Sequence, residues 1–311
     1  MNSETLIVLT PVYEDRPSAR MLIQELTQHL DHFVLVIVED GSIQDPLQIS
    51  DLIESGLKGE ILYLARNVGH QRAIATGLAH VAEHYPDCNV VVLDSDGEDR
   101  PSKIPGLLNK LSETDVDVIV ANRGRRKEKL TFRFFYFFYR LFFSLLTGKV
   151  IDFGNFVAMK PKAVKRLTKM QELWVHFPAA VIVSKLRVKA VKCDRGLRYV
   201  GESKMNFVSL VLHGMRSVMV FAESVLVRLG VLCVIVAALS LFGIALVLVL
   251  KYIGMATPGW VTTVAGFLVV IFFQVGILTM ITLMITGTVR GSPQVFEIEL
   301  DQIIDQIETT P

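Results

Sequence analysis

The sequence predicts an α/β domain with a mostly parallel sheet, followed by an interfacial helix and a hydrophobic hairpin of two helices. Short β-rich runs alternate with amphipathic stretches through the first half of the chain, and this alternation is typical of parallel sheets covered by helices. The charged residues are unevenly distributed, since Lys251 is the only one between Leu229 and Val289. Elsewhere about a quarter of the residues are charged, as in ordinary soluble domains.

The α/β prediction depends on runs of β-branched and apolar residues bounded by turn residues. The predicted strands are Leu6–Val12, Phe33–Val38, Ile61–Ala65, Val90–Leu93 and Val116–Ala121. The clearest helical patterns between them are Gln71–His84 and Ile104–Leu111.

Two uncharged segments near the C-terminus, Leu229–Leu250 and Val261–Val289, are each long enough to cross a bilayer. Pro258 and Gly259 interrupt the short link between them, which predicts a hairpin. The alternative is a pair of buried core helices. Arginines flank the hairpin on the domain side, at positions 216, 228 and 290, against Lys251 in the link. The positive-inside rule then predicts a cytoplasmic domain on a multi-pass protein of the cell (inner) membrane.

Met205–Phe221 is apolar but interrupted by His213 and Arg216, which predicts a helix lying on the membrane surface, or alternatively a packed helix of the soluble domain. The predicted organisation is a cytosolic α/β domain over residues 1–204, an interfacial helix over 205–224, two transmembrane helices over 225–290 and a cytosolic tail over 291–311. The tail alternates apolar and polar residues and is expected to add a strand or a short helix.

The net charge of +1 gives no reason to expect a nucleic-acid partner. The three cysteines, Cys88, Cys193 and Cys233, lack the spacing of a zinc site or a disulfide framework and fit a reducing compartment. The N-terminal residues lack a basic region and a long apolar run, so no signal peptide is expected.

Each predicted strand ends in a distinctive polar group. These groups are Pro-Val-Tyr-Glu at 11–14, Glu-Asp-Gly-Ser at 39–42, Arg-Asn-Val-Gly at 66–69, Asp-Ser-Asp-Gly at 94–97 and Asn-Arg at 122–123. In open α/β sheets, ligands bind beyond the carboxyl ends of the strands. We therefore expect the five groups to converge on one site.

The segments LTPVYED, VEDGS, ARNVGHQRAIATGLAHV and VVLDSDGEDRP resemble, in order, the motifs of glycosyltransferase family 2, which has the GT-A fold. Within it the chain resembles the branch of dolichol-phosphate mannose synthase and bactoprenol glucosyltransferase, which shares the interfacial helix and the two-helix hairpin. The resemblance implies metal-dependent transfer of a sugar, with inversion, from a nucleotide-sugar donor to a polyprenyl phosphate.

Asp94 and Asp96 follow an apolar strand, and a turn at Gly97 would let both carboxylates reach one hard cation. A divalent ion would neutralise the charge that develops on a departing diphosphate. The resemblance assigns the pair to metal and nucleotide, with Asp96 as a catalytic residue. It places a glutamine ligand where this chain has Glu98. The predicted metal ligands are Asp94, Asp96 and Glu98, and the predicted cofactor is Mg²⁺ or Mn²⁺.

The remaining motif residues are predicted to bind the donor. The resemblance places the first strand end at the base and ribose, and Asp40 at the base. Arg72 lies in the first turn of a predicted helix, whose N-terminal amides favour anions. The predicted donor-binding residues are Pro11, Tyr13, Glu14, Asp40, Asn67, Gln71, Arg72, Asp94 and Ser95.

The stretch from Arg123 to Arg140 is rich in aromatic residues, and Arg126, Arg133 and Arg140 recur every seven positions. On a helix they form one basic stripe among aromatic rings, a combination typical of the membrane interface. We predict that it admits a lipid phosphate, and the resemblance also places acceptor-binding arginines here, matched by Arg123, Arg126 and Arg133. The alternative is a core helix whose arginines reach solvent.

Asn155 stands where the branch usually has an aspartate that has been read as a catalytic base. An amide cannot accept a proton in that role, and Asp152 is the nearest carboxylate in the sequence. A phosphate acceptor needs no base, because its second pKa lies near 6, whereas a hydroxyl acceptor needs one. Asp152 and Asn155 are therefore both candidate catalytic residues.

Two other functions stay open at this point. One is the same donor chemistry with a hydroxyl acceptor, such as a lipid or a growing glycan, which the Asn155 departure favours, whereas the basic aromatic segment favours a phosphate. The other is a non-catalytic membrane scaffold that keeps the fold, against which the intact Asp40, Asp94 and Asp96 argue. The basic segment with Arg195, Arg198 and Lys204 is either an active-site loop or a cluster that holds anionic lipid. Homo-oligomers through the transmembrane helices are also left open.

Overall fold

The computed structural model describes residues 5–123, 141–201, 207–255, 257, 259–291 and 299–311. The chain divides into two compact units. The first unit comprises Met1–Lys129, Ile151–Val220 and Gln294–Pro311, and the second comprises Leu130–Val150 and Phe221–Pro293.

The first unit is built on one eight-stranded sheet with the order β7-β5-β6-β4-β1-β2-β3-β8. Its central strands β4, β1, β2 and β3 are mutually parallel, whereas β6 and β8 run antiparallel to their neighbours. The strands are β1 Leu6–Val12, β2 Phe33–Glu39, β3 Gly59–Leu64, β4 Asn89–Val92, β5 Val118–Arg123, β6 Phe153–Met159, β7 Val188–Cys193 and β8 Ile304–Thr309.

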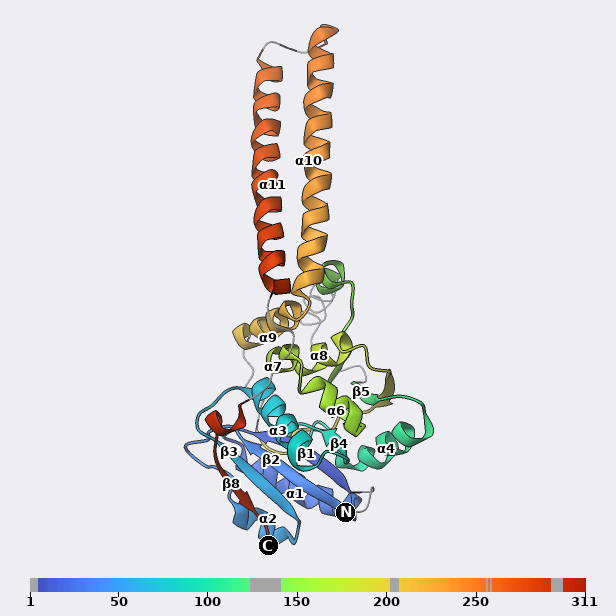
Figure 1. Cartoon of the computed structure of the whole chain (residues 1–311), viewed down its shortest axis with the longest axis vertical. Helices are drawn as coiled ribbons and strands as arrows, with labels where there is room; N and C mark the ends of the chain where they lie inside the picture. The colour runs from blue at the N-terminus through green and yellow to red at the C-terminus, as the bar shows by residue number, and fades with distance from the viewer. Residues whose placement is uncertain (1–4, 124–140, 202–206, 256, 258, 292–298) are drawn as a thin grey trace. The chain divides into compact units, whose positions relative to one another are not determined.

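Helices cover both faces of this sheet (Figure 1). One face packs against α3 (His70–His84), α6 (Pro161–Leu167), α7 (Gln171–Val175) and α8 (Phe177–Val183). The other packs against α1 (Arg16–His29), α2 (Ile49–Ser55) and α4 (Ile104–Glu113), which follows the short 3₁₀ turn η1 (Pro101–Lys103). This arrangement is the α/β class that the sequence predicts.

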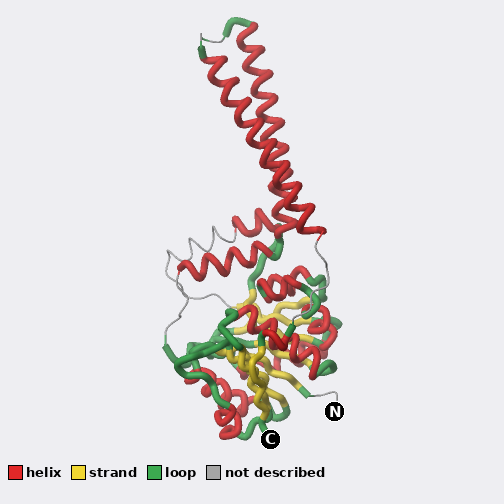
Figure 2. The backbone as a smooth tube through the Cα atoms, turned by 60° about the vertical axis from the view of Figure 1, so that its left-hand side comes forward, coloured by secondary structure: helices red, strands yellow, loops and turns green. Residues whose placement is uncertain are grey.

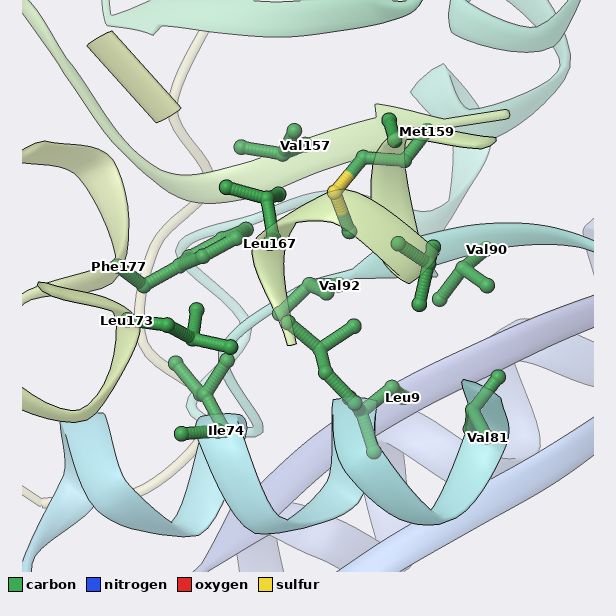
Figure 3. Packing of buried hydrophobic residues seen from close by; sticks show 14 of the residues in the cluster. Leu9, Ile74, Val81, Val90, Val92, Val157, Met159, Leu167, Leu173 and Phe177 are labelled. Atoms are coloured by element: carbon green, nitrogen blue, oxygen red, sulfur yellow. The ribbon is translucent and has the colours of Figure 1, made fainter. Parts of the chain in front are cut away.

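The strands alternate their side chains between the two cores because successive residues of a strand point to opposite faces. In β1, for example, Ile7 and Leu9 join the α3 side and Val8 joins the α1 side. Figure 3 shows the α3-side core, in which Leu9 lies near Ile74 and Val81 of α3. Burying such a side chain fully stabilises the fold by about 1.5 to 3 kcal/mol.

The five predicted strands all form, with ends that differ by up to two residues. Two further strands, β6 and β7, were not in the predicted set, and β8 forms in the tail, where a strand or a short helix was expected. β7 is an edge strand that exposes most of its residues. β8 lies in the C-terminal tail, after the short 3₁₀ turn η2 (Leu300–Gln302), and closes the opposite edge by pairing with β3.

The second unit contains two long apolar helices, α10 (Ala222–Tyr252) and α11 (Trp260–Gly291), packed side by side as a hairpin (Figure 2). Both are long and apolar enough to cross a membrane, with best-window mean hydropathies of 3.0 and 2.6. Only 17% and 6% of those windows are buried within the structure. A soluble core helix would be mostly buried, so these helices present apolar surface that the described residues of the chain do not cover.

Residues 141–147 of the second unit are also helical. The buried ring of Phe143 meets that of Phe221 edge to face, and the Arg228 guanidinium donates to the carbonyl of Leu145, 3.1 Å away. A cation at the C-terminal end of a helix satisfies carbonyls that lack intrahelical partners. The aromatic stretch that precedes this helix lies outside the described residues.

The predicted interfacial helix forms in the first unit as α9, over Phe207–Met219. Ser217 is buried, whereas Val211, Met215 and Met219 are exposed. Because these three apolar residues are spaced four apart, they form one stripe along the helix.

Candidate active site

The polar groups predicted to converge do follow strands whose carboxyl ends meet at one edge of the sheet. Val12 of β1 pairs with Glu39 of β2, and Leu9 of β1 pairs with Val92 of β4. The residues that follow these strands therefore emerge at the same edge, as parallel strands require.

Glu14, after β1, organises the loop that follows β2. Its carboxylate accepts from the backbone N–H groups of Ile43 at 2.6 Å and Gln44 at 3.1 Å. Its own N–H donates to Ser42 Oγ at 2.7 Å. Glu14 adopts φ 47°, a left-handed conformation that is uncommon outside glycine. Strain of this kind persists where surrounding contacts fix the backbone, as they do here.

Asp40, in the second polar group, is buried and holds the turn before α3. Its two carboxylate oxygens accept from the N–H groups of Val68 at 2.7 Å and Gly69 at 2.9 Å. The Asn67 amide donates to the same side chain at 3.2 Å. Burial raises the pKa of Asp40 to about 6, against the effect of these hydrogen bonds. Gly41 lets the two loops meet, since a Cβ there would lie 2.6 Å from the Asn67 nitrogen.

Asn155 of β6 connects three polar residues at the centre of the site. Its Nδ2 lies 3.0 Å from Asp94 Oδ1 and 2.9 Å from His70 Nε2, and these two atoms are themselves 3.0 Å apart. Its Oδ1 accepts from Gln71 Nε2 at 3.2 Å. Gln71 Oε1 in turn accepts from the backbone N–H of Phe177 at 2.7 Å.

His70 begins α3, and its imidazole is partly exposed beside Asp94. Desolvation lowers the pKa of His70, but the negative charges of Asp94, Asp40 and Asp96 outweigh this effect and leave the pKa raised. The imidazole is thus a cation-forming group beside a predicted metal ligand.

The turn 94–99 presents four acidic side chains. Asp96 Oδ1 accepts from the Glu98 N–H at 3.0 Å, and Asp99 Oδ2 accepts from the Asp94 N–H at 3.2 Å. Gly97 adopts φ 86°, a conformation that glycine adopts without steric cost. These bonds fix the backbone that carries the predicted metal ligands Asp94, Asp96 and Glu98.

The segment that follows β7 lies directly against this turn. Arg195 forms an ion pair with Glu98, and Arg198 lies 3.3 Å from Asp96 Oδ2. The Tyr199 N–H donates to the Asp96 carbonyl at 2.9 Å, and a Cβ at Gly97 would lie 2.7 Å from the Tyr199 ring. Of the two interpretations left open for this basic segment, the contacts of Arg195 and Arg198 favour the active-site loop. Lys204 lies outside the described residues.

Other predicted residues occupy varied positions. Arg72 stacks its guanidinium 5.5 Å from the centre of the Trp174 ring, and Asp152 accepts from the Asn122 amide at 2.8 Å. Pro11 and Ser95 are buried, while Tyr13 is 47% exposed.

The predicted acceptor arginines Arg126, Arg133 and Arg140 lie outside the described residues. The backbone of Arg123 ends β5, but its side chain is not described.

Sequence reasoning missed His70, Asp99 and Tyr199 as site residues, and it left the role of Arg195 and Arg198 open between an active-site loop and a lipid-binding cluster. His70 sits within a quoted motif, but its contact with Asp94 depends on β4 and α3 coming together. A signal for the loop existed in Gly97 and Gly196, because a Cβ on Gly196 would lie 2.3 Å from the Gly97 carbonyl oxygen. The two glycines thus mark a close approach of two backbones.

The carboxylates of the 94–99 turn are chemically suited to Mg²⁺ or Mn²⁺, which prefer oxygen ligands. Within the described ranges, no group of three His, Cys, Asp or Glu side chains is arranged around one metal position. The imidazole of His70 lies 3.0 Å from Asp94, and the guanidinium of Arg198 lies 3.3 Å from Asp96, where its charge offsets part of the negative charge of the turn.

Similar proteins are glycosyltransferases. The chain is 26% identical over 264 residues to the glycosyltransferase YkcC of Bacillus subtilis, covering 81% of this chain and 80% of that protein. It is 27% identical over 300 residues to a glycosyltransferase of Synechocystis, covering 92% and 90%. It is 24% identical over 212 residues to the undecaprenyl-phosphate 4-deoxy-4-formamido-L-arabinose transferase of Salmonella paratyphi B, covering 66% of this chain and 63% of that protein.

Among solved structures, glucosyl-3-phosphoglycerate synthase from Mycobacterium tuberculosis, in complex with Mn²⁺, UDP and glucosyl-3-phosphoglycerate, superposes with a TM-score of 0.51 at 18% identity. The match covers 72% of this chain and 79% of that one, and supports a GT-A-like fold. The family model for glycosyl transferase family 2 matches residues 7–168. Because this model spans half of the chain, the chain belongs to glycosyl transferase family 2, whose members transfer sugars from nucleotide-sugar donors.

Proposed function

We propose that this glycosyltransferase transfers its sugar to a polyprenyl phosphate at the cytoplasmic face of a cell membrane, with inversion. The Salmonella relative is named for undecaprenyl phosphate as its acceptor, which supports this acceptor class. The observation that carries the proposal is Asn155, an amide that donates to Asp94 where the branch usually has a carboxylate.

An amide at this position cannot take a proton from an acceptor hydroxyl. A phosphate monoester, with its second pKa near 6, arrives ionised at neutral pH and needs no base. One of its oxygens forms a bond to the anomeric carbon of the sugar while the bond from that carbon to the diphosphate oxygen breaks. The electron pair leaves with the nucleoside diphosphate, and no proton has to move in the step.

The donor would bind along the edge described above. Tyr13 and Glu14 would frame the base and ribose together with Asp40, Asn67 and Pro11. The diphosphate would lie between Ser95 and the N-terminus of α3, where Arg72 lies, while the buried Gln71 amide is bonded to Asn155 and the Phe177 N–H. A helix N-terminus favours anions through its unpaired N–H groups and its dipole. The Glu14 and Asp40 contacts support this assignment because they hold both loops in place.

Asp94, Asp96 and Glu98 would hold Mg²⁺ or Mn²⁺ together with the donor diphosphate. When bound, such an ion supplies Lewis-acid stabilisation of the departing diphosphate. Arg195 and Arg198 contact Glu98 and Asp96, and their guanidinium groups would add positive charge beside a bound diphosphate.

Two features support a membrane location. α10 and α11 are long, apolar and mostly unburied, and α9 carries an exposed stripe of apolar residues. The chain leaves the first unit after Val220 and rejoins it at Gln294, and β8 then pairs with β3. If these helices cross a membrane, they must cross it an even number of times, because both ends of the segment return to one folded unit. The arginines at 216, 228 and 290 would place that unit in the cytoplasm.

The test compares two lipids that differ only in the acceptor group. Full-length protein in detergent is incubated with a panel of sugar nucleotides and Mn²⁺, and with either undecaprenyl phosphate or undecaprenol, and the lipids are analysed by mass spectrometry. We expect a glycosylated phospholipid product and none from undecaprenol. Transfer to undecaprenol alone would refute the proposed acceptor.

A hydroxyl acceptor is the second candidate, and the exposed carboxylate of Asp152 is the feature that favours it. In that case Asp152→Asn would abolish transfer, since a hydroxyl acceptor requires a base. With a phosphate acceptor the same variant should keep most of its activity.

A further inference from the structure

The hydrogen bonds through Asn155 run in one direction from α8 to Asp94. They link the Phe177 N–H to Gln71, Gln71 to Asn155, and Asn155 to Asp94 over distances of 2.7, 3.2 and 3.0 Å. The four residues come from α8, α3, β6 and the end of β4. Gln71 and Asn155 are both buried, so their amides depend on these partners rather than on water.

The direction of this series of hydrogen bonds is fixed by the groups at its two ends, the Phe177 N–H and the Asp94 carboxylate. A backbone N–H can only donate, so Gln71 must present its oxygen to Phe177 and its nitrogen to Asn155. Asn155 must then present its oxygen to Gln71 and its nitrogen to Asp94. The ionised Asp94 can only accept, which is the role that this order leaves to it. Each amide therefore has one orientation.

We propose that Asn155 and Gln71 are positioning residues that hold the Asp94 carboxylate in place for the metal and the donor diphosphate. The inference rests on the proposed assignment of Asp94 to the metal. Asn155 fixes Asp94 Oδ1 directly, and Gln71 acts on Asp94 only by fixing the orientation of Asn155. Groups that orient a metal ligand are worth about 10- to 100-fold in metal affinity.

This role explains why an amide suits position 155 in this chain. An aspartate could accept from Gln71, but it could not donate to Asp94 and would place a second carboxylate about 3 Å from the first. An asparagine completes the hydrogen-bond chain without that repulsion. Asn155 thus contributes to the donor side of the reaction rather than to activation of the acceptor.

The test uses three full-length variants in detergent. Asn155→Ala removes the contact with Asp94. Gln71→Met has similar length but removes both hydrogen bonds of Gln71 and leaves Asn155 and Asp94 unchanged. Thr76→Val is the matched control, because Thr76 is also buried on α3 and donates to the Arg72 carbonyl at 2.9 Å, one turn beyond Gln71 and outside the chain of hydrogen bonds.

Mn²⁺ binding is measured by electron paramagnetic resonance with UDP, and in a second series with GDP, in the absence of acceptor. Melting temperatures are recorded in EDTA. We expect the Mn²⁺ dissociation constant to rise about 10- to 100-fold in Asn155→Ala and by a smaller factor in Gln71→Met. Thr76→Val should lower the melting temperature but leave Mn²⁺ affinity unchanged.

Wild-type Mn²⁺ affinity in Gln71→Met would overturn the proposal, because Gln71 would then have no influence on the metal site. An equal loss of Mn²⁺ affinity in Thr76→Val would overturn it too, because the loss would then reflect only a loosened α3. Failure of the wild-type protein to bind Mn²⁺ with either nucleotide would overturn it too. These measurements contain no acceptor, so a wrong assignment of the acceptor lipid leaves their outcome unchanged.

Discussion

Replacing Asp40 with asparagine separates the role of its charge from the role of its shape. The carboxylate accepts one backbone N–H on each oxygen, from Val68 and from Gly69. An asparagine has nearly the same size but only one oxygen. Its NH₂ group must therefore face one of the two N–H donors, and the turn that leads into α3 must shift.

The expected change in stability at neutral pH is small because two effects oppose each other. Burial raises the pKa of Asp40 from 3.8 to about 6, so the ionised side chain costs the folded state roughly 3 kcal/mol, which the neutral amide avoids. Losing one hydrogen bond to a charged group, with a buried N–H left facing another donor, costs about 1.5 to 3 kcal/mol. The variant should therefore unfold at nearly the wild-type temperature at pH 7.5.

The two proteins should separate as the pH falls. The pKa of Asp40 is higher in the folded than in the unfolded chain, so its contribution to stability is complete below about pH 4 and is lost as the pH rises through about 6. Between pH 7.5 and pH 5 the wild-type protein should gain about 1.5 kcal/mol over Asp40→Asn. For a domain of this size that corresponds to roughly 3 to 6 °C in melting temperature.

Thermal unfolding of both proteins in detergent at the two pH values measures this difference. The other titrating groups are the same in both proteins, so their contributions to stability cancel in the comparison. A separate assay at pH 7.5 should show the KM for the sugar nucleotide raised about tenfold, equivalent to roughly 1.4 kcal/mol of lost binding. An equal gap between the two melting temperatures at both pH values would refute the raised pKa. An unchanged KM would refute the view that Asp40 shapes the donor site.

Three further predictions address the metal, the topology and the acceptor. Asp96→Asn should lower the rate of sugar transfer at least about 100-fold while the protein stays folded. EDTA should abolish wild-type activity until Mg²⁺ or Mn²⁺ is restored. Full turnover in excess chelator would contradict the metal assignment. A reporter fused after Pro311 and a cysteine at Thr257 should be labelled from opposite sides of the membrane, and labelling of both from one side would exclude a two-span hairpin. Arg126→Ala and Arg133→Ala should each lower kcat/KM for the lipid acceptor about 10- to 100-fold and leave donor affinity unchanged, since a charge-assisted hydrogen bond contributes roughly 1.5 to 3 kcal/mol. Lysine at either position should restore only part of this kcat/KM, because it lacks the planar fork of arginine.

The sequence predicts the fold well where the signal is local. Buried strands such as β1 and β2 are continuous apolar runs with both faces covered, and such runs are visible in the sequence itself. The edge strands β7 and β8 lack this pattern. Their pairing comes from distant residues, as when Ile307 of β8 meets Leu62 of β3.

The candidate site shows the same division. The acidic turn at 94–99 and the Asp40 motif are contiguous, so sequence patterns identify them. The contacts of Asn155 are not contiguous, since Gln71 and Asp94 lie on other elements. The sequence shows only that the amide of Asn155 cannot act as a base. Its contacts with Gln71 and Asp94, which indicate a positioning role, are known only from the folded structure.

The pairing of β3 with β8 has a consequence for biosynthesis. Gly59 and Thr310, whose side chain accepts the Gly59 N–H, are 251 residues apart. At 5 to 20 residues per second, the nascent β3 edge waits roughly 10 to 50 s for its partner, while both apolar helices emerge from the ribosome. An unpaired strand edge is a template for aggregation. Completion of the sheet is therefore delayed until both helices have been synthesised, so a chain that stalls before β8 leaves the β3 edge unpaired.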